Sequence, residues 1–264
     1  MNRLVCWFSC GATSAVATRL ALLDTEGIDT HVVYCDTGSE HPDNLRFLKD
    51  VERWINHPIE IIKSAEYADI WDVFKRTRWL VGVAGARCTT ELKKLPRLAY
   101  QQPDDVQVFG FDADEADRVK RFKRENPDVD LVTPLLDRGL TKADCLSMLE
   151  RSGIAIPAMY RLGFTNANCV GCVKGGAGYW NKIRRTFPDV FARMAAMERE
   201  LDAAILKREG PNGERLRVFL DELDPAAGRD DEVLGECSLL CYTAEQEIEA
   251  KRVKPYPHFP APHA

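Results

Sequence analysis

The sequence predicts an α/β protein: a parallel sheet of about five strands with helices on both faces, followed by a helical C-terminal part. Two observations lead to this class. Short apolar runs alternate with segments of helical periodicity, which is typical of successive βαβ units. Three of these runs are followed by FSCGATS, DTG and GFDADE, and such strand ends are where parallel sheets bind ligands.

The elements of the first part follow from these patterns in order. Strands are expected where apolar runs are short, as in HVVYC and VQVFG, and helices where apolar residues recur every three or four positions. The stretch rich in Arg, Trp and Gly after the third strand is expected to be a loop. The strands are expected at 3–8, 31–35, 59–62, 106–110 and 130–135, and the helices at 14–24, 43–55, 89–101 and 114–125.

The pattern changes after Pro134, which leads to a division into a nucleotide-binding α/β domain (1–140) and a helical and loop region (141–264). TKAD (141–144) resembles a capping box and predicts a helix that ends at Ser152-Gly153. Two further helices are expected at 178–186 and 189–207, and REGPNGE (208–214) is expected to be a turn or loop. A helical stripe predicted to lie in the core comprises Phe191, Met194, Met197, Leu201 and Ile205.

Composition narrows the function classes. The 264 residues are 45% hydrophobic, enough for a sizeable core, and the net charge of −5 argues against non-specific nucleic-acid binding by a basic surface. No apolar run is long enough for a transmembrane helix and no secretory signal is visible, so a cytoplasmic location is expected. Assembly into a homo-oligomer stays open.

The stretch FSCGATS lies between a strand and a helix, which is a favourable geometry for binding phosphate. Backbone N–H groups at a helix N-terminus are available to an anion, and the helix dipole favours negative charge. Ser9, Gly11, Thr13 and Ser14 supply small residues and hydroxyl donors. An ordinary tight βα connection is the alternative, since the stretch matches neither the GxxxxGK[ST] nor the GxGxxG motif.

Nine cysteines require an explanation in a reducing compartment. Cys6, Cys35 and Cys145 lie in apolar or helical runs and are expected to be small buried hydrophobes. Cys169 and Cys172 form a CxxC in an Asn- and Gly-rich loop. Zinc and iron–sulfur clusters need about four ligands, so the other ligands must lie elsewhere in the chain. A cluster, structural zinc and a redox dithiol all remain open on spacing alone.

Five stretches together resemble the phosphoadenosine phosphosulfate (PAPS) reductase-like family of the PP-loop superfamily, over roughly residues 3–190. FSCGATS is similar to the PP-loop SGGxDS, with Cys10 in place of Gly and Thr13 in place of Asp. The other four stretches, in family order, are Asp36-Thr37-Gly38, Arg87 to Pro96 with Cys88 and Lys93, Gly110 to Glu115 with Asp112 where Arg is usual, and Asn168 to Cys172.

The resemblance implies an adenine nucleotide α-hydrolase-like fold and a sulfonucleotide reductase. Substrate phosphates would lie on Ser9–Ser14 and the adenosine near Asp36, Thr37 and Gly38, while basic residues including Arg87 and Lys93 favour a polyanionic ligand. A [4Fe-4S] cluster would be held by Cys88, Cys169, Cys172 and Cys241. Cys237, in a loose match to the family's C-terminal motif, would be the nucleophile; the reverse assignment of Cys237 and Cys241, or one role for both, stays open. A thioredoxin-like thiol would release sulfite.

Two other hypotheses stay open. One is a PP-loop sulfurtransferase that uses ATP and acts on nucleic acid; Thr13 in place of Asp and the acidic balance argue against it. The other is a non-catalytic iron–sulfur protein that binds a nucleotide. Departures from the family pattern keep it open, at Cys10, Thr13, Thr89, Asp112 and Leu240.

Overall fold

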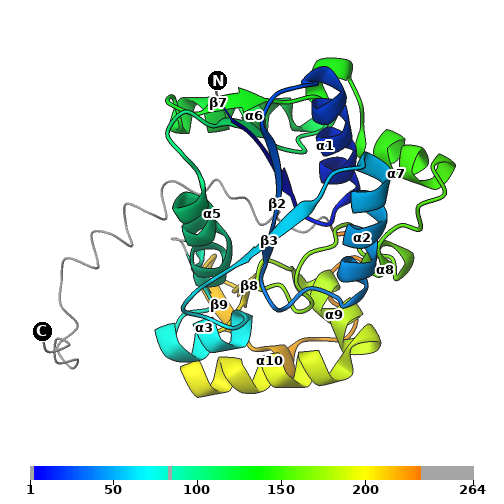
Figure 1. Cartoon of the computed structure of the whole chain (residues 1–264). Helices are drawn as coiled ribbons and strands as arrows, with labels where there is room; N and C mark the ends of the chain where they lie inside the picture. Colours follow the sequence, from blue (N-terminus) through cyan, green and yellow to red (C-terminus); the bar gives the residue numbers. More distant parts are fainter. Residues whose placement is uncertain (1–2, 83–84, 233–264) are drawn as a thin grey trace, which may run out of the picture.

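The molecule is built on a five-stranded sheet (Figure 1). All of its strands are parallel, and their order is β3-β2-β1-β6-β7. The computed structural model describes residues 3–82 and 85–232. The predicted α/β class is confirmed, and each strand lies within two residues of its expected start. The strands are β1 (Leu4–Phe8), β2 (Thr30–Asp36), β3 (Ile59–Lys63), β6 (Val106–Val108) and β7 (Asp130–Val132).

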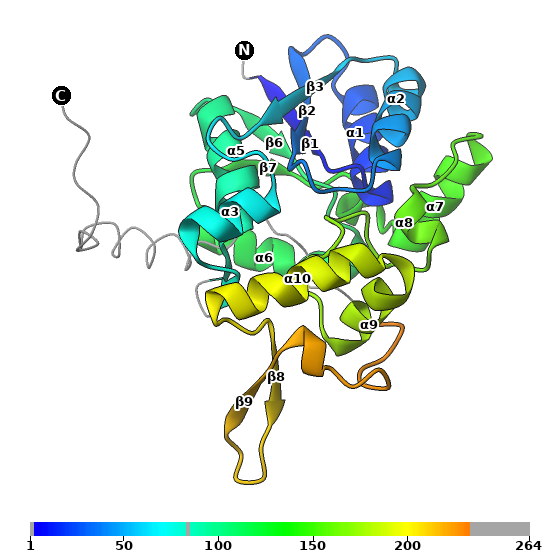
Figure 2. The same cartoon turned by 90° about the horizontal axis from the view of Figure 1, so that it is seen from below.

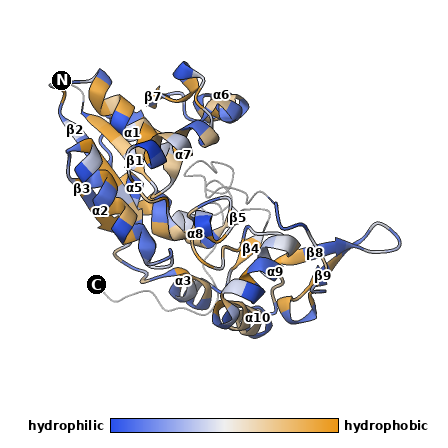
Figure 3. Ribbon diagram, turned by 90° about the vertical axis from the view of Figure 1, so that its right-hand side faces the viewer, coloured by the Kyte–Doolittle hydropathy of each residue, from blue (hydrophilic) through white to orange (hydrophobic). Residues whose placement is uncertain are grey.

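Strand β1 is buried on both faces, and its side chains alternate between two cores. Leu4, Cys6 and Phe8 pack under α1 (Ala12–Asp24), α2 (Asp43–Ile55) and α7 (Lys142–Arg151). Val5 and Trp7 face α6 (Ala116–Glu125) and the end of α5 (Leu95–Tyr100). The covering helices carry both hydrophilic and hydrophobic colours in Figure 3, as expected for helices with one buried side.

A third core lies beside the sheet. It joins α3 (Ile70–Thr77), α9 (Ala177–Thr186) and α10 (Pro188–Leu201) to the loop that carries Cys169 and Cys172 (Figure 2). Met194 and Met197 are buried there and Phe191 is partly buried, which confirms the predicted helical stripe as core. The short helix α8 (Ala158–Arg161) leads from α7 toward this region.

The helix expected at 189–207 ends earlier, at Leu201. Asp202 adopts a left-handed conformation with φ of 48° and caps the helix, its N–H reaching the carbonyls of Glu198 and Arg199. The chain then forms the antiparallel hairpin of β8 (Leu206–Glu209) and β9 (Arg215–Val218), which projects from the body in Figure 2. The prediction of helix beyond 201 was therefore wrong, because cross-strand pairing outweighs local helical spacing.

The stretch expected as a loop after β3 contains α3, which begins where the Asp69 side chain accepts the Asp72 N–H at 2.8 Å. Two short strands follow, β4 (Val81–Gly82) and β5 (Gly85–Ala86). The helix expected at 89–101 is a continuous run of α4 (Arg87–Thr89), a π-helical turn (Thr90–Lys94) and α5. Within the described parts of the chain, no helix is long and apolar enough to cross a membrane.

Candidate functional site

A pocket of about 120 Å³ opens at the carboxyl end of the sheet, between β1 and β6. The sheet order places β2 and β3 on one side of β1, and β6 and β7 on the other. The pocket therefore lies at the point where the strand order reverses, which is the usual ligand site of doubly wound sheets. The end of β1 contributes Ser9, and the end of β6 contributes Phe109, Gly110 and Phe111.

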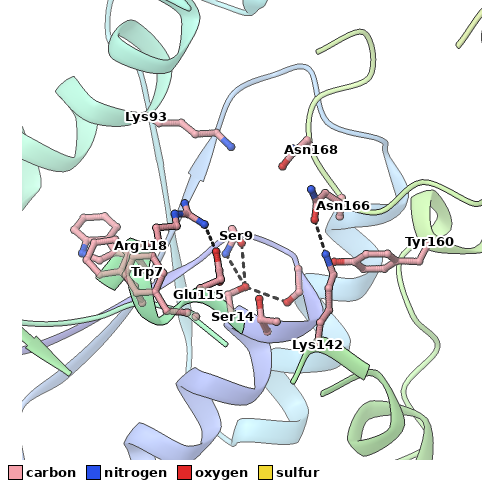
Figure 4. A pocket seen from close by; sticks show the side chains of 16 residues that line it. Trp7, Ser9, Ser14, Lys93, Glu115, Arg118, Lys142, Tyr160, Asn166 and Asn168 are labelled. Carbon is pink, nitrogen blue, oxygen red and sulfur yellow. Dashed lines mark hydrogen bonds and ion pairs between the residues drawn. The ribbon is translucent and has the colours of Figure 1, made fainter. Parts of the chain in front are cut away.

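The Ser9–Ser14 loop forms one wall and is held by the Ser14 hydroxyl (Figure 4). Ser14 Oγ accepts the Ser9 N–H at 3.1 Å, lies 3.1 Å from Ser9 Oγ and donates to the Gly11 carbonyl at 3.0 Å. Gly11 is the N-cap of α1 and offers no side-chain cap. The Tyr160 hydroxyl accepts the Ala12 N–H at 3.4 Å, and the dipole of α1 favours an anion at this end of the helix.

Cys10 stands in this loop where the PP-loop has Gly. Its backbone is left-handed, with φ of 56°, a conformation that costs a non-glycine residue about 1 kcal/mol or more. Its side chain is fully buried and directed at the Asn44 carbonyl, 3.5 Å away. Burial raises the pKa of this thiol well above its usual range, so Cys10 acts as packing for the loop rather than as a thiolate.

Three cations and one carboxylate surround the pocket: Lys93, Arg118, Lys142 and Glu115. Arg118 forms an ion pair with Glu115, and its guanidinium lies 5.1 Å from the Phe111 ring centre. Lys142 Nζ lies 2.5 Å from both the Thr165 carbonyl and Asn166 Oδ1, as Figure 4 shows for Asn166. A net positive wall in a chain of net charge −5 favours an anionic ligand.

The sequence-predicted binding residues divide into two groups. Five of them line this pocket: Ser9, Gly11, Thr13, Ser14 and Lys93. The others lie outside its lining. Asp36 pairs with Lys63 at 2.7 Å and accepts the Gly38 N–H at 2.8 Å, and Thr37 is buried. Arg87 pairs with Glu91 at 2.5 Å.

Several lining residues were missed by sequence reasoning. Lys142 stood in the predicted TKAD cap, which the structure confirms as a capping box between Thr141 and Asp144, but nothing in the sequence indicates that it lines a pocket with Ser9–Ser14. Asn166 and Asn168 were visible in the Asn-rich stretch before CVGC. The lining residues outside the five family-like stretches are Trp7, Phe109, Arg118, Lys142, Tyr160, Asn166 and Ala167.

Asp112 stands where the family has Arg, and here it caps a helix. It forms a capping box with Glu115: the Asp112 carboxylate accepts the Asp114 N–H at 3.0 Å, and Glu115 accepts the Asp112 N–H at 3.2 Å. The cation that lines this side of the pocket is instead Arg118, which lies in the first turn of α6. Position 112 is therefore a helix cap here, and the nearby cation belongs to another element.

The loop of residues 166–176, here called the cysteine loop, brings Cys169 and Cys172 into the third core, with Cys88 packed against that core. The buried Tyr179 hydroxyl accepts the N–H groups of Gly171 at 3.0 Å and Cys172 at 2.9 Å. Thr37 Oγ1 lies 3.1 Å from Cys169 Sγ. The loop is thus fixed from both sides.

The donor chemistry at this loop is that of thiols, which suit zinc or an iron–sulfur cluster. Within residues 3–82 and 85–232, however, no three His, Cys, Asp or Glu side chains are grouped so as to hold a metal ion. Cys241 and Cys237, the predicted fourth ligand and nucleophile, lie outside the described residues. Cys6, Cys35 and Cys145 are confirmed as buried hydrophobes, and burial raises the pKa of their thiols to about 12, 11 and 12.

Fold and pocket together define a doubly wound α/β protein whose Ser9–Ser14 loop lines a pocket at the switch point of its sheet. The family model of the phosphoadenosine phosphosulfate reductase domain matches residues 3–175, and the chain belongs to this family. The match covers the whole sheet, the Ser9–Ser14 loop and the CVGC motif.

Two curated relatives are similar to this chain. An uncharacterized protein of Methanocaldococcus jannaschii is 26% identical over 202 residues, which are 72% of this chain and 40% of that protein. An uncharacterized nin region protein of Escherichia phage lambda is 26% identical over 198 residues, 63% of this chain and 64% of that protein. The chain thus spans less than two thirds of the length of either relative.

Among solved structures, the phosphoadenylyl-sulfate (PAPS) reductase of Candida auris, in a phosphate complex, is similar to this chain. It aligns with a TM-score of 0.49 and 14% identity, covering 64% of this chain and 82% of that one.

Proposed function

We propose that this protein is a sulfonucleotide reductase that binds an adenosine phosphosulfate in the pocket between β1 and β6. The observation that carries the proposal is the pocket wall itself: the start of α1, the Ser9–Ser14 loop and the ammonium groups of Lys93 and Lys142 border one cavity. A phosphate-bearing ligand is attracted by all of these groups at once. The chain belongs to the PAPS reductase domain family, which supports a nucleotide as the ligand that carries this phosphate.

The proposed reaction uses Cys237 as nucleophile. Its thiolate forms a bond to the sulfur of the sulfonate group, and the bond from that sulfur to the phosphate oxygen breaks, the electron pair leaving with the nucleotide. A dithiol donor of the thioredoxin class then attacks the Cys237 sulfur, and sulfite departs with the electron pair. The second thiol of the donor closes its own disulfide and returns Cys237 as a thiol.

The residues of the pocket have roles in this scheme that need no metal. Ser9–Ser14 and Lys142 hold the phosphate, which orients the sulfonate and stabilises the nucleotide as leaving group. The Trp7, Phe109 and Phe111 side chains make the pocket partly apolar, so that water competes less for the phosphate.

A [4Fe-4S] cluster on Cys88, Cys169, Cys172 and Cys241 is part of the proposal. It is supported by the CVGC spacing and by the packing of Cys88, Cys169 and Cys172 in one apolar core. Such a cluster would link Cys88 to the cysteine loop and make that loop rigid. No step above is routed through it.

Sulfite release tests the proposal. Anaerobically purified protein is incubated with adenylyl sulfate or PAPS and a dithiol donor, and sulfite is measured; Cys237→Ser should abolish release while AMP still binds. AMP binding without sulfite from either substrate would favour the non-catalytic alternative, and ATP-dependent pyrophosphate release on adding nucleic acid would favour the sulfurtransferase. Iron and acid-labile sulfide near four per chain are expected; zinc or no metal would refute the cluster.

A further inference from the structure

The carboxylate of Glu40 contacts Lys93 with one oxygen and Thr37 with the other. Its Oε1 lies 3.6 Å from Nζ of Lys93, which lines the pocket, and its Oε2 accepts the Thr37 N–H at 3.2 Å and the Thr37 hydroxyl. The Glu40 side chain is only 5% exposed and that of Lys93 13%. Because buried charges are poorly screened, a change at either end of this carboxylate is felt at the other.

Thr37 carries the contact onward to the cysteine loop. Its hydroxyl touches both the Glu40 carboxylate and Cys169 Sγ, the latter at 3.1 Å. The backbone makes the same connection: Glu40 forms an antiparallel bridge with Cys169, and the Val170 N–H donates to the Ser39 carbonyl at 2.9 Å. The Glu40 segment therefore holds the first cysteine of CVGC by side chain and by main chain.

We propose that Glu40 is a positioning residue that couples occupancy of the pocket to the placement of Cys169, through Lys93 on one side and Thr37 on the other. An anionic ligand competes with Glu40 for the Lys93 ammonium. A buried carboxylate that loses its cation depends more on its other donors, and those that Glu40 contacts are the N–H and hydroxyl of Thr37, whose Oγ1 also contacts Cys169. This inference rests on the proposed function for the identity of the ligand, but the contacts themselves do not depend on it.

The coupling is reciprocal, as every equilibrium coupling between two sites must be. Thr37 is 2% exposed and is not among the residues that line the pocket. If Thr37 only packed the core, its hydroxyl would not influence ligand affinity. If the coupling exists, Thr37→Val weakens ligand binding and Thr37→Ser, which keeps the hydroxyl, restores it.

Hydrogen exchange of the cysteine loop measures the coupling without requiring turnover. The readout is the Val170 amide, in the full chain as purified anaerobically, with and without AMP. Without ligand, Lys93→Met and Glu40→Gln should each speed the exchange of the Val170 amide about fivefold or more. Addition of AMP should speed that exchange in the wild type but not in Glu40→Gln. By calorimetry, Thr37→Val should bind AMP about threefold or more weakly, and Thr37→Ser like the wild type.

Asp105→Asn is the matched control. It breaks another buried carboxylate–cation pair, with Arg3 at 2.7 Å, at the opposite end of the sheet, and should leave Val170 exchange unchanged. Wild-type exchange at Val170 in both Lys93→Met and Glu40→Gln would overturn the inference. So would equal acceleration in Asp105→Asn, which would indicate general loosening. If AMP fails to bind the wild type, the proposed function fails. Val170 exchange measured without ligand in Lys93→Met and Glu40→Gln still decides whether the coupling exists.

Discussion

Gly110 lies against Ser14 across the floor of the pocket: a Cβ on Gly110 would be 2.7 Å from the Ser14 backbone nitrogen. The loop after β6 thus packs directly on the first turn of α1. This close approach brings the ends of two strands together around one cavity, and only a residue without a side chain permits it.

Gly110→Ala should therefore separate β6 from the start of α1. We expect AMP binding at least about tenfold weaker and a loss of about 1–3 kcal/mol in the free energy of unfolding, because the new methyl group meets backbone rather than a flexible side chain. Calorimetry and urea unfolding measure the two effects. Gly27→Asn is the control, since Gly27 has φ of 84° with open space around it and Asn tolerates that conformation. Wild-type affinity in Gly110→Ala would show that the pocket is not where AMP binds.

Lys142→Met should weaken phosphate binding while the fold survives. The ammonium lies beside Tyr160 and Asn166 on the pocket wall, and a hydrogen bond to a charged group contributes roughly 1.5–3 kcal/mol, or about tenfold or more in affinity. The affinity for AMP and its salt dependence should both fall. Lys120→Met removes an equally charged but exposed lysine of α6, paired with Asp117, and should bind AMP like the wild type. Equal affinities in the two variants would contradict the assignment of Lys142.

Tyr179→Phe should loosen the cysteine loop. Its hydroxyl accepts the N–H groups of Gly171 and Cys172, and a buried N–H without an acceptor costs about 1–3 kcal/mol. We expect faster hydrogen exchange of these two amides and less iron or zinc retained per chain. Tyr100→Phe removes a hydroxyl that contacts His31 at 2.9 Å, on a different element, and should retain wild-type metal content. Unchanged exchange at Gly171 and Cys172 would refute this role.

Glu198 should make stability depend on pH in the direction opposite to most carboxylates. It is fully buried and accepts two N–H groups at 2.6 Å each, from Ile205 just before β8 and from Leu220 just after β9. Both lie at the base of the β8–β9 hairpin. Burial raises the pKa of Glu198 above its usual value. The folded state therefore binds more protons than the unfolded state between these two pKa values, and stability falls as pH rises through that range.

Glu198→Gln tests this assignment. The free energy of unfolding of the wild type minus that of the variant should be greatest near pH 4 and should shrink toward pH 7, because only the wild type loses a proton on that carboxyl. Urea unfolding across this range provides the measurement. Glu200→Gln changes an exposed carboxylate of the same helix and should follow the wild-type pH dependence. A difference that stays constant or grows with pH would contradict the argument.

Local patterns predicted much of the first part of the fold. The helix at 43–55 was predicted with its exact bounds, since Leu45, Leu48, Val51 and Ile55 repeat at helical spacing and Asn56 ends it in a left-handed conformation. The α3 helix was missed although Asp69 caps it and Ile70, Trp71, Val73 and Phe74 form its buried side. That signal was present, and the surrounding Arg and Gly residues obscured it.

The sequence by itself determined the five strands of the sheet, most of the helices between them, the Ser9–Ser14 loop, CVGC and the family to which they point, because these depend on residues close together in the chain. Only the tertiary structure decided which distant residues share a site. Parallel pairing of β1 with β6 brings Gly110 to Ser14, and the packing of α7 and α8 brings Lys142 and Tyr160 beside them. Contacts between distant segments depend on strand order and core packing, and no local periodicity specifies those.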